Sequence, residues 1–118
     1  MKRLAVTVLI LGSCTALTPQ QEAERDFRRA RMTDDVRRKL ELLDRAIEIH
    51  PTAEAHLERA LLSETAREPS RALADLTAAI EFLRDQPARA TLLLGRAVLL
   101  GNARRYAEAE ADLAEVIR

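Results

Sequence analysis

A repeat constrains the fold of this chain more than any other feature of its sequence. Residues 53–81 match residues 90–118 at a fixed offset of 37, and twelve of the 29 aligned positions are identical. A period of a few tens of residues is typical of stacked units that share one continuous core. The shared positions include Leu57/Leu94, Arg59/Arg96, Ala60/Ala97, Ala72/Ala109, Asp75/Asp112 and Leu76/Leu113.

Composition narrows the class of protein further. The 118 residues fit one domain, and the 47% apolar fraction with only 3% aromatics suits closely packed helices. Charged residues make up 32% and alternate in sign, which is typical of solvated helix faces. The zero net charge argues against a nucleic-acid partner, and the single Cys excludes an intramolecular disulfide or a zinc cage built from cysteines.

Apolar residues at helical spacing predict six helices, at 19–31, from 33–35 to before Pro51, and at 53–67, 70–83, 87–100 and 104–117. Thr18 and Gln21 fit a capping box, Thr52 and Ser70 are expected to cap later helices, and Gly101-Asn102 is expected to end one in a left-handed turn. The helices form three hairpins, at 19–51, 52–86 and 87–118. The first is a divergent copy, because its matches at an offset of 33 lie only in its second helix.

Several apolar positions are expected to face inward. In the second hairpin these are Leu57, Ala60 and Leu61, with Leu73, Leu76, Ile80 and Leu83 expected to be buried, and in the first Val36, Leu40, Leu43 and Ile47 form one apolar stripe. The apolar residues of the third hairpin are Leu92 to Leu94, Val98 to Leu100, Tyr106, Ala109, Leu113, Val116 and Ile117. The repeated Arg and Asp also predict an ion pair within each of the last two hairpins, worth about 1 kcal/mol at most if it is exposed.

Residues 34–118 resemble the tetratricopeptide repeat, a 34-residue helix–turn–helix family. In that family a small residue of the first helix packs on an Ala of the second, here Ala60 with Ala72 and Ala97 with Ala109. The Trp and Tyr that the family carries in the first helix are absent, Lys39 replaces an Ala, and the spacing is 33 and then 37. The resemblance implies an all-α superhelix of about three helical hairpins, whereas a generic antiparallel helical bundle is the alternative.

The first 14 residues resemble a bacterial lipoprotein signal peptide. Lys2 and Arg3 precede an apolar run at 4–11, which is too short for a transmembrane helix of about 20 residues. Leu11-Gly12-Ser13-Cys14 then matches the lipobox, so the resemblance implies a signal peptide at 1–13, a tether at 14–18 and a helical domain at 19–118. The alternatives are an ordinary signal peptide cut near Ala16, or an uncleaved start with a chance Cys.

The lipobox resemblance implies that Cys14 is lipidated with acyl chains such as palmitate, which anchor the protein to the membrane of the bacterial cell envelope. Thr15 follows the Cys, where Asp marks inner-membrane retention in enteric bacteria. This favours the outer membrane, with the domain facing the periplasm.

The sequence contains no catalytic constellation, metal-ligand set or phosphate-binding loop, so we expect neither an enzyme nor a cofactor. The repeat resemblance implies instead a scaffold that binds a protein or peptide partner on its concave surface. That surface comes from the first helix of each unit, which here supplies Arg25, Arg28, Arg31, Leu57, Leu61, Glu64, Leu94, Val98 and Asn102.

The C-terminal helix at 104–117 is expected to remain partly uncovered at Leu113, Val116 and Ile117, because the sequence ends there. Self-association through this helix, burial against a partner and truncation of a longer repeat protein all account for that exposure. An accessory subunit that docks on a larger envelope or secretion complex through this helix is therefore the alternative to a concave-face scaffold.

Overall fold

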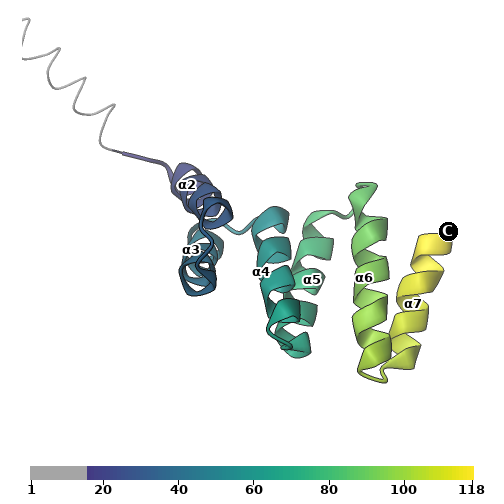
Figure 1. Ribbon diagram of the computed structural model, residues 1–118. Coiled ribbons are helices and arrows are strands. Elements are labelled where there is room, and N and C mark those ends of the chain that lie inside the picture. Colours follow the sequence, from purple (N-terminus) through teal and green to yellow (C-terminus); the bar gives the residue numbers. More distant parts are fainter. Residues whose placement is uncertain (1–15) are drawn as a thin grey trace, which may run out of the picture.

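The computed structural model describes residues 16–118, and this part of the chain is all-α (Figure 1). The predicted signal peptide and Cys14 lie outside the described residues. Six helices are present in the described range: α2 (Pro19–Met32), α3 (Val36–Ile49), α4 (Ala53–Thr65), α5 (Pro69–Phe82), α6 (Ala88–Asn102) and α7 (Tyr106–Ile117).

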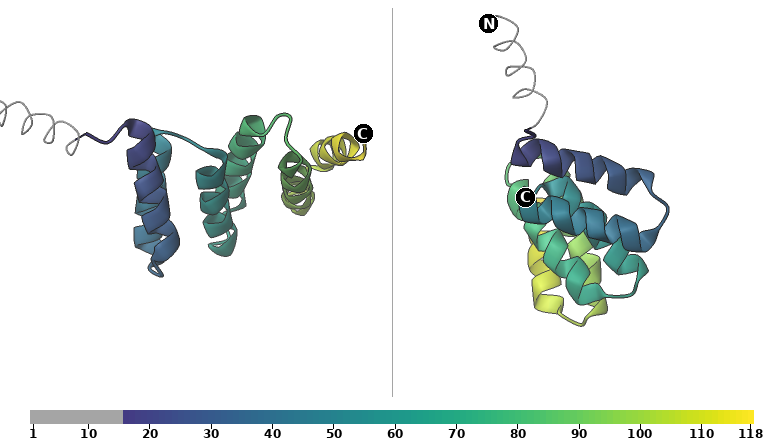
Figure 2. Two further views of the ribbon diagram at one scale, coloured as in Figure 1. Left: turned by 90° about the horizontal axis from the view of Figure 1, so that it is seen from above. Right: turned by 90° about the vertical axis from the view of Figure 1, so that its left-hand side faces the viewer.

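The helices pair as three consecutive antiparallel hairpins, α2/α3, α4/α5 and α6/α7, which stand in a row (Figure 1). Each hairpin also packs on the next one through α3 with α4 and through α5 with α6. Figure 2 shows that successive hairpins are rotated about the long axis, so the row is a superhelix. The predicted fold class, an all-α superhelix of three helical hairpins, is confirmed.

Small residues allow the two helices of a hairpin to approach closely. Ala60 and Ala72 are completely buried in the second hairpin, and Ala97 and Ala109 are buried together in the third. The continuous core passes from one hairpin to the next, because Leu76 and Ile80 of α5 pack in one cluster with Leu92 and Leu93 of α6. Methyl-sized side chains at these crossings leave room for ridge-to-groove packing of the helices.

Two of the three predicted N-terminal caps, at Thr18 and Thr52, are present, and Asp35 provides a further one. Thr18 and Gln21 form a capping box, with the Thr18 Oγ1 3.1 Å from the Gln21 amide and the Gln21 Oε1 3.0 Å from the Thr18 amide. Asp35 and Thr52 cap α3 and α4. The Ser70 prediction was wrong, because α5 begins one residue earlier, at Pro69, and its first turn has no side-chain cap.

The predicted left-handed stop at Gly101-Asn102 was also wrong. Both residues remain helical, and the positive φ falls on Arg104 (63°), just as it falls on Arg67 (59°) at the equivalent position of the second hairpin. At each turn two backbone hydrogen bonds close the helix end. The one that spans more residues runs from the Glu68 amide to the Ser63 carbonyl in the second hairpin, and from the Arg105 amide to the Leu100 carbonyl in the third. This double closure is a Schellman motif, whose left-handed residue is usually Gly.

Two of the side chains expected on inward-facing stripes, Val36 and Leu61, are exposed, and so is Tyr106 of the third hairpin. Val36 and Tyr106 are each the first residue of their helix, where a side chain projects past the end of the partner helix. Helical periodicity predicts which side chains share a face of the helix. It does not predict where along the helix the neighbouring helices stop covering that face.

The left-handed turn gives a test of the hairpin connection. Replacing Arg104 by Gly is expected to raise the free energy of unfolding by about 0.5 to 1 kcal/mol, because Gly adopts positive φ without a Cβ clash. Arg104→Ala is the matched control, since it removes the same side chain but keeps the clash, and it is expected to give no gain. Thermal or urea unfolding of the three proteins measures the difference, and equal gains in both variants would contradict the backbone explanation.

Candidate functional site

A clamp of charged side chains joins the helices of the second hairpin. The guanidinium of Arg59 (α4) donates to both carboxylate oxygens of Asp75 (α5), from Nε at 2.9 Å and from Nη2 at 2.8 Å. Its remaining nitrogen, Nη1, donates to Asp44 of α3 at 2.9 Å. One guanidinium therefore ties the two helices of its own hairpin together and also holds the preceding hairpin.

The third hairpin has the same arrangement. Arg96 (α6) donates to Asp112 (α7) from Nε at 2.8 Å and Nη2 at 2.7 Å, and its Nη1 lies 3.2 Å from the Thr77 Oγ1 of α5. Thr77 occupies the position in α5 that Asp44 occupies in α3. The predicted ion pair is present in both hairpins, and it is bidentate and largely buried, so its loss costs more than the limit for an exposed pair.

The first hairpin lacks this pair and has a different arrangement of charges. Asp26 of α2 stands where α4 carries Arg59, and it is completely buried. The nearest cations are Arg25 and Arg45, whose Nε atoms lie 3.7 and 3.8 Å from its two carboxylate oxygens. These distances exceed hydrogen-bond range, so charge attraction alone compensates this carboxylate among the described residues.

His56 adds a second partner to Asp75. Its Nδ1 lies 2.9 Å from the Asp75 Oδ1, and its ring stacks on Phe82 with the centroids 6.0 Å apart. Burial acts to raise the pKa of Asp75, but hydrogen bonds from Arg59 and His56 outweigh it, so the pKa of Asp75 lies below its ordinary value. Because an ionised carboxylate only accepts hydrogen bonds, Nδ1 carries a proton. His56 is therefore a structural residue of the clamp.

The lowered pKa of Asp75 predicts a pH-dependent contribution to stability. The charged clamp stabilises the fold fully above the ordinary pKa of Asp, about 4, and this stabilisation is lost as the pH falls through the lower pKa of the folded state. We expect Asp75→Asn to reduce the free energy of unfolding by about 2 to 4 kcal/mol at pH 7. Urea unfolding from pH 7 to pH 3 should show wild type and variant converging.

Asp112→Asn is the matched control for this substitution. It removes the same bidentate partner of an Arg in the third hairpin, but Asp112 has no His partner. Its cost at pH 7 should be smaller than that of Asp75→Asn. An equal cost of the two substitutions would show that His56 contributes nothing. A difference in stability between wild type and Asp75→Asn that does not change with pH would show that the charge of Asp75 contributes nothing.

The predicted concave-face residues of α4 and α6 occupy matching positions of the repeat. Leu57 and Leu94 are equivalent positions of the repeat, as are Leu61 and Val98, and Leu61, Leu94 and Val98 are exposed although they are large and apolar. Glu64 and Asn102 are exposed near the ends of the same helices. Exposed apolar residues in matching register on neighbouring helices are typical of a binding surface.

The basic residues predicted for this face are divided on α2. Arg25 and Arg28 border a hollow with Leu17, Gln21 and Glu24. Arg31 lies over the Phe27 ring, 5.8 Å from its centroid. The exposed pair that continues the register of Leu57 and Leu61 into α2 is Glu24 and Arg28, so the face is polar in the first hairpin and apolar in the other two.

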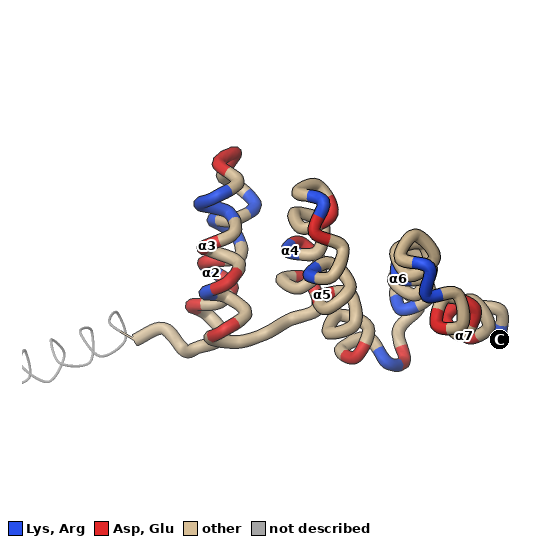
Figure 3. Tube along the Cα trace, turned by 90° about the horizontal axis from the view of Figure 1, so that it is seen from below, with Lys and Arg blue, Asp and Glu red and all other residues tan. Residues whose placement is uncertain are grey.

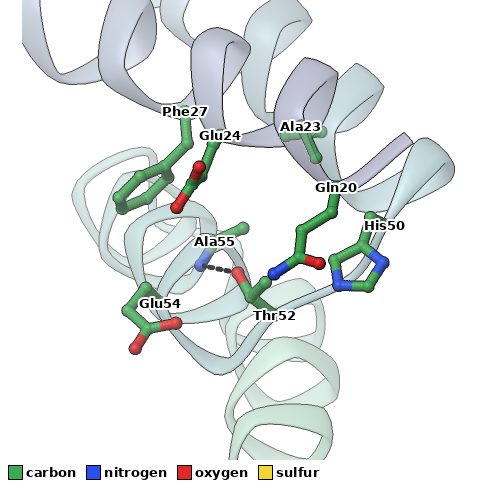
Figure 4. Close-up of a pocket in the computed structure, with 9 residues that line it drawn as sticks. Gln20, Ala23, Glu24, Phe27, His50, Thr52, Glu54 and Ala55 are labelled. Atoms are coloured by element: carbon green, nitrogen blue, oxygen red, sulfur yellow. Dashed lines mark hydrogen bonds between the residues drawn. The ribbon is translucent and has the colours of Figure 1, made fainter. Parts of the chain in front are cut away.

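A cavity of about 240 Å³ lies between the first two hairpins (Figure 4). Its walls are apolar at Ala23 and Phe27 of α2, at Ala46 of α3 and at Ala55 of α4. Polar side chains surround it in Figure 4: Gln20, Glu24, His50, Thr52 and Glu54. No local sequence pattern predicts this site, because its residues come from three helices and from the segment that connects α3 with α4.

The repeat explains why the cavity exists. Ala55 is equivalent to Leu92 of α6, and Leu92 packs with Leu76 and Ile80 at the junction between the second and third hairpins. A methyl group at position 55 leaves the corresponding space at the first junction empty. The replacement of Leu by Ala between the two copies was the one sequence signal for this cavity.

Filling the cavity tests this explanation. Ala55→Leu is expected to raise the free energy of unfolding by about 0.5 to 2 kcal/mol, as cavity-filling substitutions commonly do. Ala60→Leu is the contrasting variant, because Ala60 is completely buried at the helix crossing, and overpacking there is expected to cost about 1 to 3 kcal/mol. Chemical denaturation of both variants measures these changes. A destabilised Ala55→Leu protein would mean that the space is not available to a side chain.

Two further features bear on function. Within residues 16–118 no three His, Cys, Asp or Glu side chains are grouped so that they could hold a metal ion. Over the same range, no helix combines the length and the apolar character needed to cross a membrane.

Comparison of the chain with protein-family models, with curated proteins and with solved structures found no match. The functional reading therefore depends on the chain's own residues and geometry.

Proposed function

We propose that this protein is a membrane-anchored lipoprotein whose helical repeats act as a protein–protein interaction scaffold in the bacterial cell envelope. The observation that carries the scaffold proposal is the exposed apolar strip of α4 and α6, formed by Leu61, Leu94 and Val98 beside the partly exposed Leu57. Removing such a strip from water favours binding of a peptide or protein surface. The resemblance to tetratricopeptide repeats supports the same side of the superhelix as the binding face.

The cavity between the first two hairpins supplies a pocket for one side chain of the partner. Its walls of Ala and Phe27 suit an apolar stem, and Glu24 and Glu54 at its border favour a positive charge at the end of that stem. A Lys or Arg side chain has both parts. The strip then fixes the apolar residues of the partner, and the cavity selects for a basic one.

Membrane attachment rests on the N-terminal sequence. The order of a basic start, an apolar run of eight residues and Leu11-Gly12-Ser13-Cys14 fits export and lipid transfer to the Cys14 thiol. Two or three acyl chains anchor a protein stably. The outer membrane, with the repeats in the periplasm, is the location that Thr15 favours.

The scaffold proposal predicts that partner binding depends on the strip. Leu61→Glu combined with Val98→Glu is expected to abolish position-specific photocrosslinking of a partner in cells, without lowering the unfolding temperature, because both residues are exposed. A crosslinker placed at Leu94 should capture the partner, and one placed at the exposed Glu81 of α5 serves as control. Equal capture from positions 94 and 81, or capture that survives the double substitution, would contradict the proposed binding face.

The anchoring proposal is tested separately. Cys14→Ser is expected to abolish incorporation of labelled palmitate and to move the protein from the membrane fraction to the soluble fraction, because a hydroxyl cannot form the thioether to the lipid. Ser13→Ala is the control, since a small residue remains in the lipobox. Equal labelling and equal fractionation of wild type and Cys14→Ser would show that Cys14 is not the anchor.

A further inference from the structure

Within residues 16–118, α7 packs only on α6, and no helix covers its outer face. Leu76 and Ile80 of α5 are 4% and 1% exposed, whereas their repeat equivalents in α7, Leu113 and Ile117, are 42% and 84% exposed. The residue types are the same in both helices. The difference arises because α6 covers α5, and within residues 16–118 no helix occupies the corresponding place on α7.

The helix that covers α5 shows what kind of occupant this surface fits. Leu92 and Leu93 of α6 pack in one cluster with Leu76 and Ile80, and Arg96, one turn later, reaches Thr77 of α5. The only charged side chains of α6 are Arg89 and Arg96. A basic amphipathic helix with two adjacent Leu residues is therefore the element that the repeat places on this surface.

Charge on α7 strengthens the preference for a basic occupant. Between Tyr106 and Ile117 the helix carries four acidic residues and no Lys or Arg. Figure 3 shows Asp and Glu along α7 in red. Three of these acids pair with arginines of the same hairpin or its turn: Glu108 with Arg105, Asp112 with Arg96 and Glu115 with Arg89.

The remaining acid of α7, Glu110, forms no ion pair among the described residues and lies one helical turn before Leu113. Glu110 also distinguishes this surface from that of α5. Its repeat equivalent is Leu73, which packs with Ala97 and Leu100 in the second half of α6. A carboxylate at this position disfavours an apolar side chain opposite it and favours a Lys or Arg, since an unpaired charge is costly to bury.

We propose that the outer face of α7, formed by Glu110, Leu113, Ala114 and Ile117, binds a basic amphipathic helix of a partner protein. Two adjacent Leu residues of that helix cover Leu113 and Ile117. A Lys or Arg about two turns further along pairs with Glu110. This site is separate from the strip on α4 and α6, so it gives the scaffold a second partner and does not depend on the first.

A second copy of this chain fits the surface less well. Two α7 helices packed face to face supply no cation to either Glu110, because α7 carries no Lys or Arg between Tyr106 and Ile117. The α2 helix of a second copy presents Glu22 and Ala23 at the positions where α6 presents its two Leu residues, and Glu22 would add a further negative charge. Charge and shape therefore both favour a different, basic helix.

A synthetic peptide provides the probe. It carries residues 86–104 of this chain with Leu100→Lys, so that it keeps the Leu pair of α6 and places a cation opposite Glu110. Fluorescence anisotropy with detergent-solubilised full-length protein is expected to show saturable binding. Leu113→Glu with Ile117→Glu should abolish it, whereas Glu48→Lys, an exposed charge change on α3, should leave it unchanged.

A charge swap makes the test specific. Glu110→Lys in the protein should weaken binding of the Leu100→Lys peptide at least tenfold, and a Leu100→Glu peptide should recover that loss. Binding that ignores the charge at position 110, or that survives the double substitution at 113 and 117, would overturn the proposal. So would a wild-type dimer in sedimentation that Ile117→Glu dissociates, because a second copy would then occupy the face.

Discussion

The structure depends on one repeated interaction, the bidentate pair between an Arg of the first helix and an Asp of the second. Arg59 with Asp75 and Arg96 with Asp112 fix the spacing of their hairpins, and the third guanidinium nitrogen of each Arg reaches the hairpin before it. Because Arg presents its donors in a rigid plane, one side chain can fix the distance between the helices of its own hairpin and also the distance to the preceding hairpin. Burial makes the pair costly to break, since either partner alone would be a charge away from water.

Two of the proposed binding surfaces arise where one copy of the repeat differs from the next. Ala55 in place of Leu92 opens the cavity between the first two hairpins, and Glu110 in place of Leu73 gives the outer face of α7 its charge. The apolar strip arises differently, because both copies keep large side chains at positions that the hairpin cannot cover. The clamp, repeated in the second and third hairpins, maintains the packing of the helices. The single differences between the copies give each proposed surface its shape and charge.

The first hairpin is held together by different physical means. Asp26 lies buried at the position of the clamp Arg, with arginines near it but beyond hydrogen-bond distance. The charge of Asp26 is compensated at longer range. The hairpin carries Glu24 and Arg28 at the positions where the second hairpin carries Leu57 and Leu61. This hairpin therefore suits the N-terminal end of the row, where α2 meets no further helix among the described residues.

Local patterns in the sequence determined the helices, the three hairpins and most of the caps. Periodicity, Pro51, Thr18 with Gln21 and the repeated Ala residues act over a few residues, so they can be read along the chain. The tertiary structure alone decided the rest. The link from Arg59 to Asp44 and the cavity beside Ala55 each depend on which helix lies opposite, and a local sequence pattern does not specify that helix.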